Sequence, residues 1–314
     1  MKYFFSIADK ILFVILVMAS GILAKKMKWI SEEGEKDMSR LMIDFIWPCM
    51  IFSSIVGNLS PQDILSNLWL PVLSLVTHFT GFALAFLLSR LAGFSGDRHR
   101  MLLLHGTMNN FFVMALPFAQ FLLPGKGAAL LAVANLGSII LLWTLGVAIV
   151  AGNQGTRQTL RNVFSPGMVS TVAGVFFVLT GLNRFIPSLL LDALQVIGQP
   201  TLLFGLMIAG TQIYKLGPSA LKFDLWNILV GLVRNILVPG VLFGLALLLR
   251  GRIGREALII FMLVNTTPAS VNSVTLAMKY DSAPHLAAEG VIFTHLLAVG
   301  TMLGYVMLIE RYLF

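Results

Sequence analysis

Ten long apolar runs, each close to the length of a membrane-crossing helix, constrain this chain more than any other feature. A helix needs ~20 residues to cross a hydrocarbon core of ~30 Å. The runs cover residues 5–24, 38–57, 66–89, 99–122, 127–151, 165–182, 188–212, 222–249, 255–278 and 286–311. Only 11% of the residues are charged, whereas soluble domains need about 25%. We therefore predict an all-α membrane protein with ten transmembrane helices.

The order of these runs indicates an internal repeat. A polar segment, Gly152–Ser165, divides the chain into residues 1–152 and 153–314, with five runs in each half. The second and seventh runs each hold a proline near their centre, Pro48 and Pro200. We predict two five-helix repeats, a design that is common in secondary transporters.

The distribution of positive charge predicts how the helices are oriented. The odd-numbered connections hold 13 of the Lys and Arg residues, and the even-numbered connections with the two termini hold 7. Because positive loops stay in the cytoplasm, we predict a protein of the cell membrane with both termini outside and Gly152–Ser165 cytoplasmic. Five helices per repeat then make the repeats inverted. The cations lie at the ends of apolar runs, so the net charge of +8 does not indicate nucleic-acid binding.

Two spans are broken by polar residues at mid-membrane depth. The fourth reads HGTMNNFFVMALPFAQFLL and the ninth VNTTPASVNSVTLAMKYD. Proline frees backbone groups, which a membrane tolerates only inside protein or beside a wet cavity. Two kinked helices whose polar residues cap their own backbone are the alternative, but the matching positions in both halves favour a binding site. The predicted substrate-binding residues are Asn109, Asn110, Pro117, Asn265, Thr266, Thr267, Pro268, Ser270, Asn272 and Ser273.

The chemistry of these breaks favours an anion. Half-helix N-termini present N–H groups and positive dipole ends to a site between them. Neither break contains Asp or Glu, so a cation site built on a carboxylate is not expected, and we predict no metal and no cofactor.

Several ionisable residues fall inside the predicted spans, where such groups are costly and often functional. They are Asp44, His78, His105, Arg234 and Glu289. Two roles are open for Arg234, attracting the anion or pairing with a carboxylate, and we favour the pairing slightly. His105 lies about one turn before Asn109, where it either couples protons or simply packs.

The remaining motifs indicate structure rather than catalysis. The sequence contains no HExxH, no GxxxxGK[ST] and no GxSxG, so we predict that the protein is not an enzyme. A single cysteine, Cys49, excludes an intrachain disulfide. Gly240 and Gly244 form a GxxxG pair, which predicts close helix packing.

The broken spans resemble a known family. TMNNFFVMALP is similar to the fourth-helix signature of the auxin efflux carrier family, within the bile acid/sodium symporter superfamily, and TTPASVNSVTLAMKYD is similar to its ninth-helix signature. SPGMVSTVAGVFFVLTG fits as well, so the resemblance covers essentially the whole chain. It implies a scaffold domain of helices 1, 2, 6 and 7, and a mobile transport domain of helices 3–5 and 8–10 in which helices 4 and 9 cross.

The resemblance also implies a function. Members of the family carry organic anions, auxin in plants and dicarboxylates such as malate and malonate in bacteria, and the compact central loop is similar to the bacterial form. We therefore expect an elevator-type carrier of a small organic anion, working as a homodimer joined through its scaffold domains. A sodium- or proton-coupled symporter of the bile acid type is the alternative, followed by a receptor or channel on the same scaffold.

The sequence departs from the family pattern at three places. Plant carriers have proline just before the key asparagine, where this chain has Asn109 before Asn110. The second proline position of the ninth helix is polar here, near Asn272 or Ser273. The glutamate that sodium-coupled relatives use is absent. These departures argue against the plant cargo and against sodium coupling.

Overall fold

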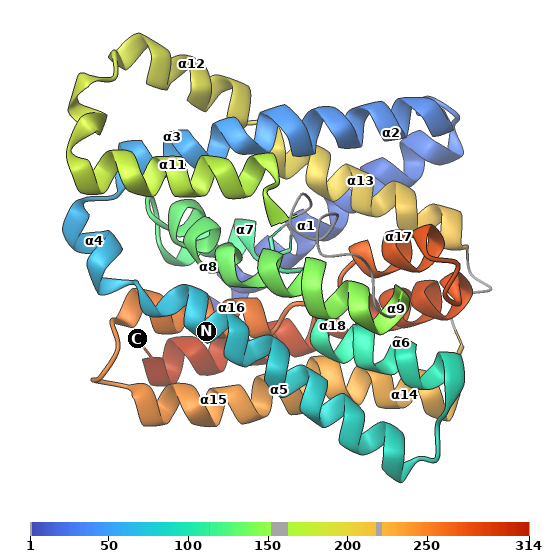
Figure 1. Ribbon diagram of the computed structural model, residues 1–314. Helices are drawn as coiled ribbons and strands as arrows, with labels where there is room; N and C mark the ends of the chain where they lie inside the picture. Colours follow the sequence, from blue (N-terminus) through green and yellow to red (C-terminus); the bar gives the residue numbers. More distant parts are fainter. Residues whose placement is uncertain (1, 113, 152–162, 218–221, 314) are drawn as a thin grey trace.

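The computed structural model describes residues 2–112, 114–151, 163–217 and 222–313, and within these ranges the chain is helical with no β-strand (Figure 1). The helices of the first half are α1 (Lys2–Lys26), α2 (Glu32–Leu41), α3 (Trp47–Asn58), α4 (Pro61–Ser66), α5 (Trp69–Leu91), α6 (Gly96–Thr107), α7 (Leu116–Leu122), α8 (Gly127–Leu141) and α9 (Val147–Ala151). Those of the second half are α11 (Pro166–Thr180), α12 (Ser188–Gly198), α13 (Thr201–Leu216), α14 (Leu225–Gly231), α15 (Val238–Leu249), α16 (Arg255–Asn265), α17 (Asn272–Lys279) and α18 (Pro284–Leu313).

Short irregular turns join several of these helices into longer rods. The π-helical turns η1 (Met42–Ile46), η2 (Leu142–Gly146) and η5 (Leu232–Leu237) connect α2 to α3, α8 to α9 and α14 to α15. The 3₁₀ turn η3 (Leu182–Phe185) precedes α12. Such π turns widen a helix locally without ending it, so each rod still presents one continuous apolar segment.

Six helical segments of the described chain are long and apolar enough to cross a membrane. They are Glu32–Asn58, Pro61–Leu91, Gly127–Ala151, Ser188–Lys215, Leu225–Leu249 and Pro284–Leu313. Pro166–Thr180 is a shorter apolar helix. These segments agree with a multi-pass helical membrane protein. Most of the predicted central loop, including Arg157 and Arg161, lies outside the described residues.

Helices from the two halves of the chain pack together in one layer. Figure 1 shows α2, α3, α11, α12 and α13 in the upper part of the view, and α1 runs from the middle of the view up to them. Helix α1 packs against α13, and α3 packs against α11 and α12. Glycine makes the first contact possible, because a Cβ on Gly21 would lie 2.2 Å from the Met207 carbonyl oxygen. A Cβ on Gly210 would lie 2.0 Å from the Met18 carbonyl oxygen. No side chain fits at these two positions.

A second group of helices holds the broken spans. Here α5 packs against α6 and α8, α14 against α18, and α15 against α16. A Cβ on Gly81 of α5 would lie 2.0 Å from the Gly106 carbonyl oxygen. The last turn of α6 is therefore pressed directly against the backbone of α5.

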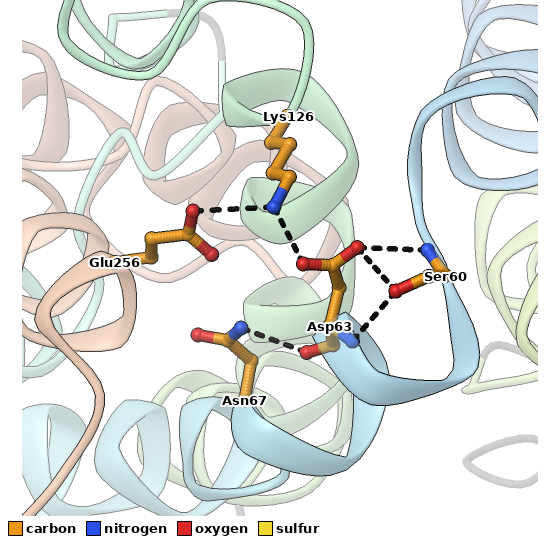
Figure 2. Close-up of polar contacts among 5 residues, drawn as sticks. All are labelled: Ser60, Asp63, Asn67, Lys126 and Glu256. Carbon is orange, nitrogen blue, oxygen red and sulfur yellow. Dashed lines mark hydrogen bonds and ion pairs between the residues drawn. The ribbon is translucent and has the colours of Figure 1, made fainter.

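A polar cluster ties the two broken spans together at one end of this group (Figure 2). Asp63 at the start of α4 forms a capping box with Ser60, and its Oδ1 lies 2.5 Å from Lys126 Nζ. Lys126 follows α7 and also reaches Glu256 Oε1, in the first turn of α16, at 3.4 Å. The hydrogen bond that Lys126 donates to the Asp63 carboxylate raises the pKa of Lys126, so the ammonium stays charged. The cluster holds the far end of α7 beside the start of α16.

The ends of the rods fall on two opposite edges of the molecule. In Figure 1 both chain ends lie in the left half of the view, and the turns after α3 and α15 lie at the left edge. The turns between α1 and α2 and between α5 and α6 lie at the right. The two termini therefore lie towards the same end of the long helices.

Candidate functional site

The broken parts of the fourth and ninth spans cross each other inside the second group of helices. Residue Asn109 forms an isolated antiparallel bridge with Ala269. The Asn110 N–H donates to the Pro268 carbonyl at 2.7 Å, and the Ser270 N–H donates to the Met108 carbonyl at 3.0 Å. Each break thus satisfies the backbone groups that the other leaves unpaired, which an apolar surrounding requires.

Amide side chains surround this crossing and leave acceptor atoms unused. The Asn109 Nδ2 donates to the Val264 carbonyl at 2.9 Å, and the Asn265 Nδ2 donates to the Phe261 carbonyl at 2.7 Å. Among the described residues, neither Asn109 Oδ1, Asn265 Oδ1 nor Ser273 Oγ has a hydrogen-bond partner, although all three atoms are buried. A buried polar atom without a partner costs about 1–3 kcal/mol, so these oxygens are suited to receive a donor.

The threonines of the ninth span are occupied by their own helix. Thr266 Oγ1 donates to the Leu263 carbonyl at 2.8 Å, and Thr267 Oγ1 to the Val264 carbonyl at 2.7 Å. For Thr266 and Thr267 the alternative interpretation is therefore correct, because their side chains cap the backbone of their own helix. Both residues still lie next to the crossing, and the Thr267 carbonyl accepts a hydrogen bond from Arg234.

The outer members of the predicted set lie further along the helices. Pro117 is buried in the first turn of α7, and Ser273 in the first turn of α17. Asn272 is exposed at the start of α17, where its N–H donates to Ser270 Oγ at 3.2 Å. The structure brings Asn109, Asn110, Pro268 and Ser270 into direct contact across the breaks, and leaves Asn272 at the edge.

Arg234 holds the ends of both half-helices. It is fully buried, and its guanidinium donates to the carbonyls of Asn265 (2.7 Å), Thr267 (3.2 Å) and Gly106 (3.3 Å). The slightly favoured pairing with a carboxylate is therefore wrong. Helix C-termini carry unpaired carbonyls and a partial negative charge, so α6 and α16 themselves supply the partner that a buried cation needs.

His78 plays a parallel part in the first half. Its Nδ1 lies 2.6 Å from the Thr107 carbonyl, the last residue of α6, and its Nε2 lies 2.8 Å from Ser138 Oγ on α8. A carbonyl only accepts, so Nδ1 is the donor. His78 and Arg234 thus both bind backbone carbonyls at the ends of the half-helices.

The three other predicted ionisable residues have their contacts away from the paired breaks. Asp44 lies on η1 with a side chain 52% exposed, and its partner is Arg40, 3.7 Å away on the same rod. Glu289 of α18 is buried and pairs with Lys222 at 2.5 Å. His105 is fully buried in α6 and packs against Gly290 of α18, where a Cβ would come within 2.5 Å of its ring.

Sequence reasoning missed two neighbouring residues of α18 that contact the crossing, Thr294 and His295. Thr294 Oγ1 accepts from the Ala269 N–H at 3.2 Å. His295, in the middle of α18, places its Nε2 at 3.2 Å from Asn110 Nδ2. It lies in a regular helix without a nearby proline or polar cluster, so no local pattern distinguishes it from a packing histidine.

A polar cavity of about 250 Å³ lies between the two groups of helices. Its lining comes from α3 and α12 on one side and from α7 and the start of α8 on the other: Ser54, Asn58, Gln120, Gly125, Gly127, Ala128 and Gln195. Amide and hydroxyl groups of this kind can both donate and accept, so the cavity is suited to a small polar solute.

Comparisons with known proteins give a consistent result. A family model described as membrane transport protein matches residues 6–160 and 155–306. An uncharacterized transporter of Methanocaldococcus jannaschii is 26% identical over 293 residues, which is 91% of this chain and 93% of the relative. An uncharacterized transporter of Methanothermobacter thermautotrophicus is 24% identical over 206 residues, covering 65% of this chain and 68% of the relative.

Proposed function

Because this chain belongs to the membrane transport protein family, we propose that it is a secondary transporter that carries a small organic anion across the cell membrane. The family match confirms the resemblance to the auxin efflux carriers. The observation that carries the proposal is the antiparallel pairing of the two broken segments, with the Asn110 N–H on the Pro268 carbonyl. Irregular backbone at membrane depth is maintained in transporters because it binds the substrate.

The packing of the helices supports an elevator mechanism. The scaffold domain of the proposal comprises α1, α2, α3, α11, α12 and α13, which pack mainly with one another across the two halves of the sequence. The transport domain comprises the helices that surround the crossing. The polar cavity lies between these two groups, which is where a solute would enter as one group moves along the other. Ten spans in two inverted five-helix repeats would produce this arrangement.

An anion fits the electrostatics of the crossing better than a cation does. Arg234 is buried within hydrogen-bond distance of both half-helix ends, and neither break contains a carboxylate. A buried cation is costly unless charge or dipoles offset it. The carbonyls that Arg234 contacts offset part of its charge, and a bound carboxylate would offset the rest. Malate, malonate and an auxin-like acid are the candidate substrates.

Two steps test the proposal. First, the purified protein is screened by thermal shift against mono- and dicarboxylates at two pH values. Second, the protein in liposomes is assayed for uptake of the labelled acids that raise its melting temperature. We expect saturable uptake of at least one acid. Binding without flux would identify a receptor, flux that does not saturate would identify a channel, and an absence of both would contradict the proposal.

A further inference from the structure

The hydrogen bonds of His295 fix its charge and the orientation of Asn110. The His295 Nδ1 lies 2.8 Å from the Val291 carbonyl, which only accepts, so Nδ1 carries a hydrogen. Its Nε2 lies 3.2 Å from Asn110 Nδ2, which only donates, so Nε2 must offer a lone pair. The ring is therefore neutral, and it holds the NH₂ end of the Asn110 amide towards α18.

Protonation of this ring would reverse the amide. An imidazolium has two N–H donors and no acceptor, so its Nε2–H would face the NH₂ group of Asn110. A half-turn of the amide about its last side-chain bond replaces NH₂ by Oδ1 and restores the hydrogen bond. The Asn110 backbone does not need to move, because its N–H stays on the Pro268 carbonyl at 2.7 Å.

The same half-turn changes what Asn110 presents on its other side. With neutral His295, the side of the amide that points away from the ring ends in an oxygen, which repels a carboxylate. With charged His295, that side ends in NH₂, which donates to a carboxylate. The ring also contributes a positive charge near the crossing.

We propose that His295 is the proton-binding residue that couples proton uptake to anion binding, by turning the Asn110 amide from acceptor to donor. This inference rests on the proposed function, because it names the coupling ion for the same site. It transfers the proton role from His105, whose ring packs against Gly290 of α18, to His295, which contacts Asn110 at the crossing.

The titratable and charged groups on the helices packed against α18 decide whether another group could bind the proton instead of His295. Helices α14 and α15 carry no titratable side chain. On η5, Arg234 is engaged by carbonyl oxygens. Among the side chains that the structure describes, the groups on the other packed helices are Asp97, Arg98, His99, Arg100 and His105 on α6, Arg255 and Glu256 on α16, Lys279 on α17, Tyr214 and Lys215 on α13, and Asp9, Lys25 and Lys26 on α1.

Most of these groups lie at helix ends or in ion pairs. Lys25 and Lys215 both contact Glu32 and Glu35, and Lys279 lies over the Trp143 ring. On α18 itself, Glu289 is paired with Lys222. His105 is also a buried histidine of this helix group and packs against α18, so it is the matched control.

The first measurement is the affinity for malonate at pH 6.5 and pH 8.5, for the full-length protein and for His295→Gln and His105→Gln. One proton taken up per anion weakens binding by up to about tenfold per pH unit. We expect this loss with the parent and with His105→Gln, and an affinity independent of pH with His295→Gln. The protonation of malonate itself changes equally in all three experiments. A difference in pH dependence between the proteins therefore comes from a group of the protein. An unchanged pH dependence in His295→Gln would overturn the proposal.

The second measurement observes the ring directly. The chain has five histidines, so ¹⁵N-histidine spectra can be assigned by comparison with His295→Gln. We expect a neutral ring hydrogenated at Nδ1 at pH 8.5, and a charged ring at pH 6.5 that malonate stabilises. If the His295 ring titrates in the Asn110→Leu variant while no carboxylate binds, His295 remains the proton site and the anion is refuted. A ring that stays neutral at pH 6.5 with malonate bound would refute the proton site.

Discussion

Asn110 is the residue on which the site depends most directly. Its backbone N–H holds the Pro268 carbonyl, while its side chain reaches His295. Asn110→Ala removes only the side chain, so the crossing should persist. Loss of a buried hydrogen-bonding group costs roughly 1–3 kcal/mol, and we expect anion binding about tenfold weaker or more. Affinity is measured by titration, and the melting temperature without ligand is measured beside it.

A matched amide separates binding from stability. Asn67 is also buried, and its Nδ2 donates to the Asp63 carbonyl at 2.8 Å in the cluster of Figure 2. Asn67→Ala should lower the melting temperature and leave the affinity for the anion unchanged. If Asn110→Ala folds stably and binds as tightly as the parent, the site has been placed wrongly.

For single residues, the sequence predicted contacts at the crossing where a polar side chain at membrane depth was combined with a nearby proline. Asn109 and Asn110 combine polarity at membrane depth with a following proline, and both lie at the crossing. His295 gives no such signal, since only the tertiary fold brings α18 to the fourth span. Asp44 was placed inside a span by hydropathy, but its half-exposed side chain pairs with Arg40. Hydropathy locates a residue along the membrane normal and does not say which neighbour it contacts.

At the scale of helices, a glycine contact fixes where α6 ends. A Cβ on Gly81 would meet the Gly106 carbonyl oxygen at 2.0 Å, and that carbonyl also accepts from Arg234. Gly81→Ala must push α6 away from α5, and overpacking of this kind costs ~1–3 kcal/mol. We expect a lower melting temperature together with weaker anion binding, since the Arg234 contact is disturbed. Thermal unfolding and ligand titration of the variant check both effects.

Gly244→Ala is the control for this change. Gly244 lies exposed on α15, and a Cβ there meets no atom within 4 Å. Alanine is about 1 kcal/mol better than glycine within a helix, so the control should be neutral or slightly stabilising. If Gly81→Ala is as stable as Gly244→Ala, the contact between α5 and α6 accommodates a methyl group and the close approach is not required.

The sequence predicted where helices lie better than how they pack. The breaks of the fourth and ninth spans fall at the predicted asparagines and at Pro268, because proline and polar clusters act locally. The GxxxG pair Gly240 and Gly244 predicted close packing, yet Gly244 has no close neighbour. Gly21, Gly81 and Gly210 make the close approaches instead, outside any such motif. Glycine spacing alone cannot identify the partner helix.

At the scale of the whole molecule, the topology is open to a direct test. Both chain ends lie in the left half of Figure 1, while the turn between α5 and α6 lies at the right. The charge bias of 13 to 7 predicts that the right edge is cytoplasmic. In a Cys49→Ser background, Ser188→Cys should react with an impermeant thiol reagent in intact cells. Ser95→Cys, in the turn before α6, should react only after permeabilisation, and the reverse pattern would contradict the orientation.

The coupling ion is likewise a property of the whole transport cycle. Residues 108–112 and 266–271, at the crossing, contain no Asp or Glu. A hard cation such as sodium takes oxygen ligands, and without a carboxylate nothing here carries a full compensating charge. Arg234, buried against the ends of α6 and α16, repels a second cation. We therefore expect anion uptake into liposomes to stay nearly unchanged when choline replaces sodium. A collapse of uptake would instead indicate that the unpaired amide oxygens of Asn109 and Asn265 are sodium ligands.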